Sequence, residues 1–260
     1  MRGRHAQRQY RARVVVGADG RHSTVAELAG AKEYLGYDNP RFYYWAQWPD
    51  TPAWPEELRS FGSYLETLRE SPVIRPLLDG NAREGKLVGL QKSRFYFREA
   101  AGPGFALVGD AGLHKDPVPG YGMTDALRDG RNLGNAILAG GDDPLVRYWR
   151  QRDVDSIDLF HFAHDMADPS YVNPLNQLVF ARARRTPELM ARIRAQADRE
   201  ISPYDVVPVG TVLRIVAGAV LRGRLSVVPA FFAAGKRGVR AQHARRERVE
   251  ALASLVANPA

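Results

Sequence analysis

The 260-residue sequence contains no cysteine. The chain therefore cannot form a disulfide, a thiolate metal site, a thiol nucleophile or a covalent cysteine link to a cofactor. This absence fits a reducing compartment, and we expect a cytoplasmic protein.

Long apolar runs are also missing. The basic N-terminus reaches Val14–Val16 too late, and that run is too short, for a signal peptide. The most apolar long region, Val206–Gly235, is interrupted by Arg214, Arg222 and Arg224. It is too broken to span a bilayer, and a buried helix pair is the preferred interpretation. A surface-lying membrane segment is the less favoured alternative.

Acidic residues are fewer than basic ones, 29 against 37, which gives a net charge of +8 and a pI of about 9.9. Such a balance raises nucleic-acid binding as a hypothesis. However, the arginines are scattered and no nucleic-acid-reading signature accompanies them, so we expect a solvated basic surface and no nucleic-acid partner. The hydrophobic fraction of 45% and the charged fraction of 25% are typical of one large or two small globular domains.

Alternation, apolar runs and turn residues predict five strands, two of them buried and ending in glycine turns. The strands are expected at residues 11–16 (buried), 42–48, 87–90, 94–97 and 105–108 (buried). Helices are predicted from residue 23, from Gly122 to Gly140 and from Asp143, and in most of the chain after 168. The helix after Gly122 places apolar residues on one face, which we expect to be buried. This face comprises Met123, Ala126, Leu127, Gly130, Leu133 and Ile137.

The most informative segment runs from Gly109 to Met123. A buried strand delivers the carboxylate of Asp110 at its C-terminal end, where open α/β sheets bind ligands and where a carboxylate suits a ribose hydroxyl. Gly120 and Gly122 let the backbone approach a flat ligand closely. The helix that starts there favours negative charge at its N-terminus.

A second segment, Val14 to Val25, has a strand followed by Asp19-Gly20, two further residues and Ser23. Asp-Gly alone is common in simple turns. The Asp19-Gly20 segment becomes informative because it occurs together with the segment at Gly109 and precedes it in the chain.

Together the two segments resemble the flavin motifs of the class A FAD-dependent monooxygenases, the para-hydroxybenzoate hydroxylase-like group. In that family Gly-Asp is followed by a proline seven residues after the aspartate and by glycines at ten and twelve, which Pro117, Gly120 and Gly122 match. His114 stands one residue later than the family's histidine, and Thr124 replaces a usual asparagine. The resulting pattern Gly-Asp-Ala-Gly-x-His-Lys-Asp-Pro, at residues 109–117, resembles that of geranylgeranyl reductase-like flavoproteins.

The resemblance implies an α/β (α+β) fold. It comprises an incomplete FAD/NAD(P)-binding Rossmann-like domain (1–33 and 101–141), an antiparallel substrate-binding sheet (34–100) and a helical C-terminal region (142–260). It also implies an FAD site. The expected cofactor-binding residues are Asp19, Gly20, Gly109, Asp110, Pro117, Gly120, Tyr121, Gly122, Met123 and Thr124. No catalytic base and no metal site are assigned.

The function implied is that of an NAD(P)H-using monooxygenase that hydroxylates a small organic substrate. A flavin-dependent reductase of prenyl-type double bonds is one alternative, and a non-catalytic remnant or partner subunit is another. The family's opening Gly-x-Gly-x-x-Gly unit is absent from the sequence. We therefore expect weak FAD binding by the chain alone, unless a separate polypeptide supplies the N-terminal half.

Four candidate metal ligands lie at three- and four-residue spacings, which would place them on one side of a helix. This cluster consists of Asp158, His161, His164 and Asp165. Carboxylates and imidazoles in that pattern suit a metal ion, but the polar side of an exposed helix is the preferred interpretation.

Overall fold

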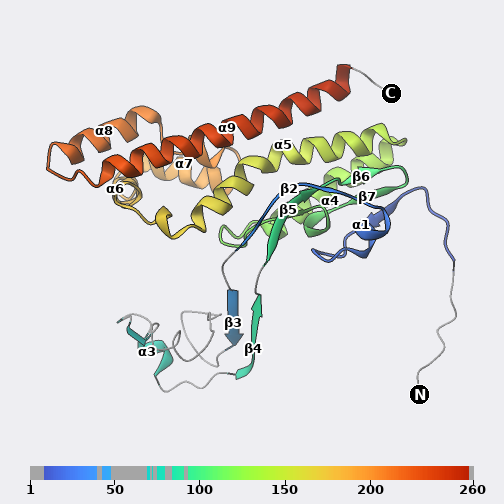
Figure 1. Cartoon of the computed structure of the whole chain (residues 1–260), viewed down its shortest axis with the longest axis horizontal. Coiled ribbons are helices and arrows are strands. Elements are labelled where there is room, and N and C mark those ends of the chain that lie inside the picture. Colours follow the sequence, from blue (N-terminus) through green and yellow to red (C-terminus); the bar gives the residue numbers. More distant parts are fainter. Residues whose placement is uncertain are drawn as a thin grey trace. The chain divides into compact units, whose positions relative to one another are not determined.

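The computed structural model describes residues 9–39, 43–47, 69–70, 72, 75–79, 84–90 and 93–257. The chain divides into two compact units, one formed by residues 1–35 and 96–260 and the other by residues 36–95. Helices and small sheets make this a mixed α/β protein (Figure 1).

The first sheet has the strand order β1-β7-β6. Its members are β1 (Val15–Gly17), β7 (Phe105–Leu107) and β6 (Ala101–Gly102). β1 runs parallel to β7, whereas β6 is antiparallel to it. The expectation that the strand at 11–16 is buried is wrong, because β1 lies at the sheet edge and Val15 is 51% exposed. The strand at 105–108 is buried as predicted, with Ala106 and Leu107 fully covered.

Among the remaining strands, β5 with β8 and β3 with β4 are antiparallel pairs. A second sheet has the order β2-β5-β8, and β3 pairs with β4. Their bounds are β2 (Glu33–Asp38), β5 (Arg94–Arg98), β8 (Leu113–His114), β3 (Tyr43–Gln47) and β4 (Glu84–Leu90). The predicted strands at 42–48, 87–90 and 94–97 are confirmed, although residues 42 and 48 themselves lie outside the described part.

Helices dominate after β8. They are α4 (Gly122–Ala139), α5 (Asp143–Met166), α6 (Pro174–Ala183), α7 (Pro187–Ala197), α8 (Val209–Val220) and α9 (Val227–Ala257), preceded by α1 (Thr24–Leu28) and α3 (Arg75–Leu78). The helix predicted from residue 23 is confirmed as α1, and Ser23 caps it, because its Oγ accepts a hydrogen bond from the Ala26 N–H at 3.0 Å. Gly140 ends α4. Within the described ranges, no helix has the length and apolarity needed to cross a membrane.

The buried face of α4 differs from the prediction. Met123 and Leu127 are 83% and 78% exposed, whereas Asp125 and Asp129 are buried together with Leu133 and Ala136. Periodicity of apolar residues placed Leu133 correctly but located the inner face wrongly in the first two turns, which bury Asp125 and Asp129. Burial of Asp125 is possible because Lys115 and Arg199 pair with it.

Helix α5 docks on the sheets through a buried polar network. Arg152 and Asp153, each 2% exposed or less, form an ion pair of 2.7 Å. Tyr34 donates its hydroxyl hydrogen to Asp153 and accepts a hydrogen bond from Trp149 Nε1 at 3.0 Å. Because a buried charge is costly unless it is paired, these contacts stabilise the position of α5.

The cluster that was expected on an exposed helix face lies instead against α9. Asp165 is 4% exposed and accepts hydrogen bonds from Arg240 of α9 at 2.5 Å and from Tyr204 at 2.8 Å. Asp158 pairs with Arg245 at 3.3 Å. The carboxylates bind arginines because α5 and α9 pack along each other, which sequence spacing could not reveal.

We predict that Asp153→Ala lowers the free energy of unfolding by about 3 kcal/mol, because it leaves Arg152 buried without its counter-charge. Urea denaturation measures the loss. The matched control is Asp155→Ala on the same helix, whose carboxylate is 32% exposed and 3.8 Å from Arg128. The control should cost less than about 1 kcal/mol. An equal loss of unfolding free energy in the two variants would show that the buried Arg152–Asp153 pair stabilises the protein no more than an exposed pair does.

The α5–α9 contact also predicts a pH dependence. Burial, followed by the nearby charge of Arg240, lowers the pKa of His161 from 6.5 to about 4. Between these values the unfolded chain binds more protons, so stability falls as the pH drops from 6.5 towards 4. We expect His161→Gln to remove about 1–2 kcal/mol of that fall, measured by urea denaturation across the window. An unchanged slope would contradict the burial of a neutral imidazole.

Candidate functional site

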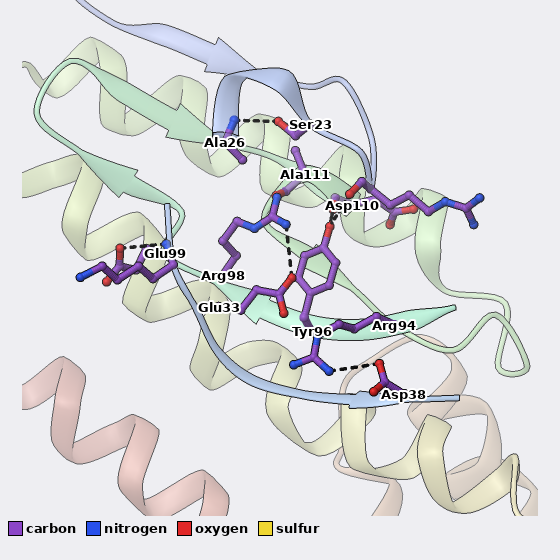
Figure 2. Close-up of polar contacts among 12 residues, drawn as sticks. Ser23, Ala26, Glu33, Asp38, Arg94, Tyr96, Arg98, Glu99, Asp110 and Ala111 are labelled. Atoms are coloured by element: carbon purple, nitrogen blue, oxygen red, sulfur yellow. Dashed lines mark hydrogen bonds and ion pairs between the residues drawn. The ribbon is translucent and has the colours of Figure 1, made fainter. Parts of the chain in front are cut away.

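Two loops meet at the carboxyl ends of strands β1 and β7 in the first sheet. Since β1 and β7 are parallel, the segments that follow them, residues 18–23 and 108–121, emerge at the same edge. Tyr96 of β5 links them, because its hydroxyl oxygen lies 2.9 Å from the carbonyl oxygens of both Arg21 and Asp110. Figure 2 shows the Tyr96 hydroxyl directed towards Asp110. Burial raises the pKa of Tyr96, so the hydroxyl stays protonated and able to donate.

The carboxylate of Asp19 organises its own loop. It accepts a hydrogen bond from the Ser23 hydroxyl at 2.5 Å and another from the Val25 N–H at 3.2 Å. The Ser23 hydrogen bond holds the pKa of Asp19 below its usual value. Gly20 has a φ of +76°, a conformation that favours glycine. These two residues therefore shape the turn that leads into α1.

The Gly109-Asp110 turn follows β7 directly. Gly109 has a φ of +58°, and Asp110 begins a short 3₁₀ turn, η1 (Gly109–Ala111). The Asp110 side chain is 46% exposed, and one of its oxygens lies 3.1 Å from His114 Nδ1. Arg98 holds the turn from below by donating to the Ala111 carbonyl at 3.2 Å (Figure 2). A half-exposed carboxylate on a fixed turn can accept a hydrogen bond from a bound hydroxyl group.

The next segment is a tight, hydrogen-bonded loop. The Val118 N–H donates to the buried carboxylate of Asp116 at 3.0 Å, and the Gly120 N–H donates to the Pro117 carbonyl at 2.8 Å. Gly120 has a φ of +75°. The internal hydrogen bonds hold the backbone in one conformation, while Pro117 and Gly120 stay exposed.

The N-terminus of α4 opens to solvent. Tyr121 precedes the helix without a side-chain cap, and Gly122, Met123 and Thr124 are exposed. The Tyr121 hydroxyl instead accepts a hydrogen bond from Gln196 Nε2 of α7 at 3.1 Å. Uncapped N–H groups at the positive end of a helix dipole attract negative charge. This is the part of the loop best suited to an anionic or electron-rich ligand.

A buried charge cluster beneath the loop was not predicted. Lys115 and Arg199 both form ion pairs with the carboxylate of Asp125 in the first turn of α4. Burial, and then the nearby Arg199, lower the pKa of Lys115 to about 7, while burial raises that of Asp129. No periodic pattern in the sequence indicates this cluster, since its members come from the loop, from α4 and from Arg199, two residues beyond the end of α7.

The structure thus brings the sequence-predicted residues to the same sheet edge from two segments. Asp19 and Gly20 lie in one loop, and the other eight occupy the continuous stretch from Gly109 to Thr124. Tyr96, Arg98 and Lys115 were missed, although each contacts or supports these loops. Arg98 and Tyr96 alternate on β5, and that spacing was the one sequence signal that could have indicated a shared face.

No protein-family profile matches the chain, and no curated protein matches it. Among solved structures, the flavin-dependent brominase Bmp2 superposes with a TM-score of 0.52 and 14% identity, covering 82% of this chain and 64% of that one. Aklavinone-11 hydroxylase, solved with FAD and aklavinone, gives 0.43 and 19% over 58% and 36%. CabE, an aromatic hydroxylase from angucycline biosynthesis, gives 0.44 and 19% over 57% and 38%.

The structural neighbours are therefore flavin-dependent halogenases and aromatic hydroxylases, at low identity and partial coverage. The chain shares part of the fold of the brominase. The chain spans 36% to 64% of the length of these three proteins.

We predict that Tyr96→Phe loosens both loops at once, because it removes the one hydroxyl hydrogen that the Arg21 and Asp110 carbonyls share. Amide hydrogen exchange should rise at residues 19–25 and 109–114, and the unfolding free energy should fall by about 1 kcal/mol. Tyr10→Phe is the control, since Tyr10 is 83% exposed. Faster exchange in one loop alone would contradict a bridging role.

Proposed function

We propose that this chain is part of an FAD-dependent monooxygenase that uses NAD(P)H and hydroxylates a small organic substrate. The observation that carries the proposal is the rigid Gly109–Gly120 loop, which leads into the exposed, uncapped N-terminus of α4. The shared fold with a flavin-dependent brominase supports the cofactor class.

The described residues fit one end of FAD. A Cβ added at Gly120 or Gly122 would meet no atom within 4 Å, so the backbone borders open space. Gly122, Met123 and Thr124 at the start of α4 are exposed, and the helix has no side-chain cap. These features suit a flat heterocycle whose reduced form is anionic. The sequence contains no Gly-x-Gly-x-x-Gly turn for the pyrophosphate, so the proposal concerns the ring end of the cofactor.

Each residue of the site has a role under this proposal. Asp110 accepts a hydrogen bond from a sugar-chain hydroxyl, and Gly120 and Gly122 leave room for the ring. The N-terminus of α4 stabilises negative charge beside it, and Lys115 with Arg199 neutralises Asp125, which would otherwise oppose that charge. FAD, when bound, supplies the electron transfer and dioxygen chemistry.

A partner subunit without activity of its own is the second candidate. The chain covers 64% of the brominase, and its sequence contains no Gly-x-Gly-x-x-Gly unit. Under this hypothesis the chain contributes the loops described above to a site that another polypeptide completes.

The test of the FAD site is Gly122→Leu. We expect FAD to bind at least about 10-fold more weakly, a loss of about 1.4 kcal/mol, because the new side chain occupies the ligand side of the loop. Quenching of flavin fluorescence measures the affinity. Gly130→Leu is the matched control, since it lies on the same helix, is exposed and likewise has nothing within 4 Å of an added Cβ.

Circular dichroism should show that both glycine variants fold alike. Equal FAD affinity for the two variants would place the cofactor elsewhere. A wild-type chain that binds no FAD alone, but binds it when an N-terminal half is added, would support the partner-subunit candidate.

A further inference from the structure

Helix α8 leaves an apolar face uncovered. Val209, Leu213, Ala217 and Leu221 follow one another at four-residue spacing and are all exposed, with Val209 at 72% and Leu221 at 88%. Residues at this spacing lie on one face of a helix. The region 206–235 is therefore not the buried helix pair that was expected: α8 contacts α6 and α9, but this face remains exposed.

The turn between α8 and α9 extends this face. We call residues 221–226 the hairpin tip; every one of them is exposed. Leu221 and Leu225, the latter 64% exposed, flank Arg222 and Arg224. Gly223 permits the turn with a φ of +75°. Figure 1 shows the tip at the end of the helical region that lies away from β6 and β7.

The charge of this region has one sign. Residues 206–246 contain eight arginines and lysines and no aspartate or glutamate. Two of the arginines, Arg240 and Arg245, bind α5 carboxylates. Arg214, Arg222 and Arg224 are exposed beside the apolar side chains. Leucines and arginines side by side, without acids, are what a surface needs to bind anionic lipid headgroups and the acyl chains beneath them.

We propose that the face of α8 and the hairpin tip bind the surface of an anionic lipid bilayer. The leucines of the tip enter the headgroup–acyl boundary, and the arginines contact lipid phosphates while their stems stay in the boundary region. α8 lies along the surface, since its twelve residues give a length of about 18 Å, too short to span a bilayer. A second copy of the chain is a poorer occupant, because pairing two such faces would bring cations together.

The test is co-sedimentation of the full chain with vesicles. One set is phosphatidylcholine, and the other contains equal parts of phosphatidylcholine and phosphatidylglycerol. We expect binding to the anionic vesicles, weakened by high salt, and little binding to the neutral ones.

Two double variants separate the contributions. Arg222→Gln with Arg224→Gln should weaken partitioning about 30-fold, whereas Arg11→Gln with Arg147→Gln, which has the same net charge, should not. Leu221→Gln with Leu225→Gln should weaken it roughly 100-fold. The control for this pair is Leu138→Gln with Leu28→Gln, because these leucines are 86% and 83% exposed elsewhere.

Equal loss in a tip variant and its control would overturn the proposal, and so would equal binding to both kinds of vesicle. The proposal would also fail if the chain did not bind vesicles and instead formed a dimer in sedimentation velocity. In that case Leu221→Gln with Leu225→Gln would dissociate the dimer. Circular dichroism checks that all variants stay folded. FAD affinity should be the same in all tip variants, so this test is independent of the proposed function.

Discussion

The buried guanidinium of Arg152 is the contact on which most of the first unit depends. It pairs with Asp153 and donates to the Arg98 carbonyl at 3.1 Å, and a Cβ at Gly112 would lie 2.4 Å from its Nη1. One side chain of α5 thereby fixes β5 and the loop after the Gly-Asp turn. A cation buried so completely is stable only with these partners in place, so helix, strand and loop are positioned together.

The candidate site follows from that framework. Parallel strands deliver two loops to one edge, and Tyr96 of β5 connects their backbones. Beneath them, Lys115 and Arg199 neutralise Asp125 at the start of α4. The exposed motif residues border open space, while the residues that hold them in place are buried and belong to other elements. Rigidity and access are thus supplied by different parts of the chain.

Two exposed surfaces of the first unit are suited to binding a partner other than water. One is the uncapped N-terminus of α4 with its open glycines, which suits an electron-rich ring. The other is the apolar and cationic α8 face with the hairpin tip, which suits an anionic interface. They belong to different helices, and the first takes a small molecule whereas the second takes an extended surface.

The sequence by itself determined the local features: the Ser23 cap, the end of α4 at Gly140, the strand at 105–108 and the glycines of the loop. Each depends on neighbours within a few residues, where propensity and turn geometry decide. Only the tertiary structure decided which faces are buried. Asp125 and Asp165 lie inside because Arg199 and Arg240, which are distant in sequence, pair with them, whereas Met123 and Leu221 remain outside. Burial of a charge depends on partners that chain spacing does not encode.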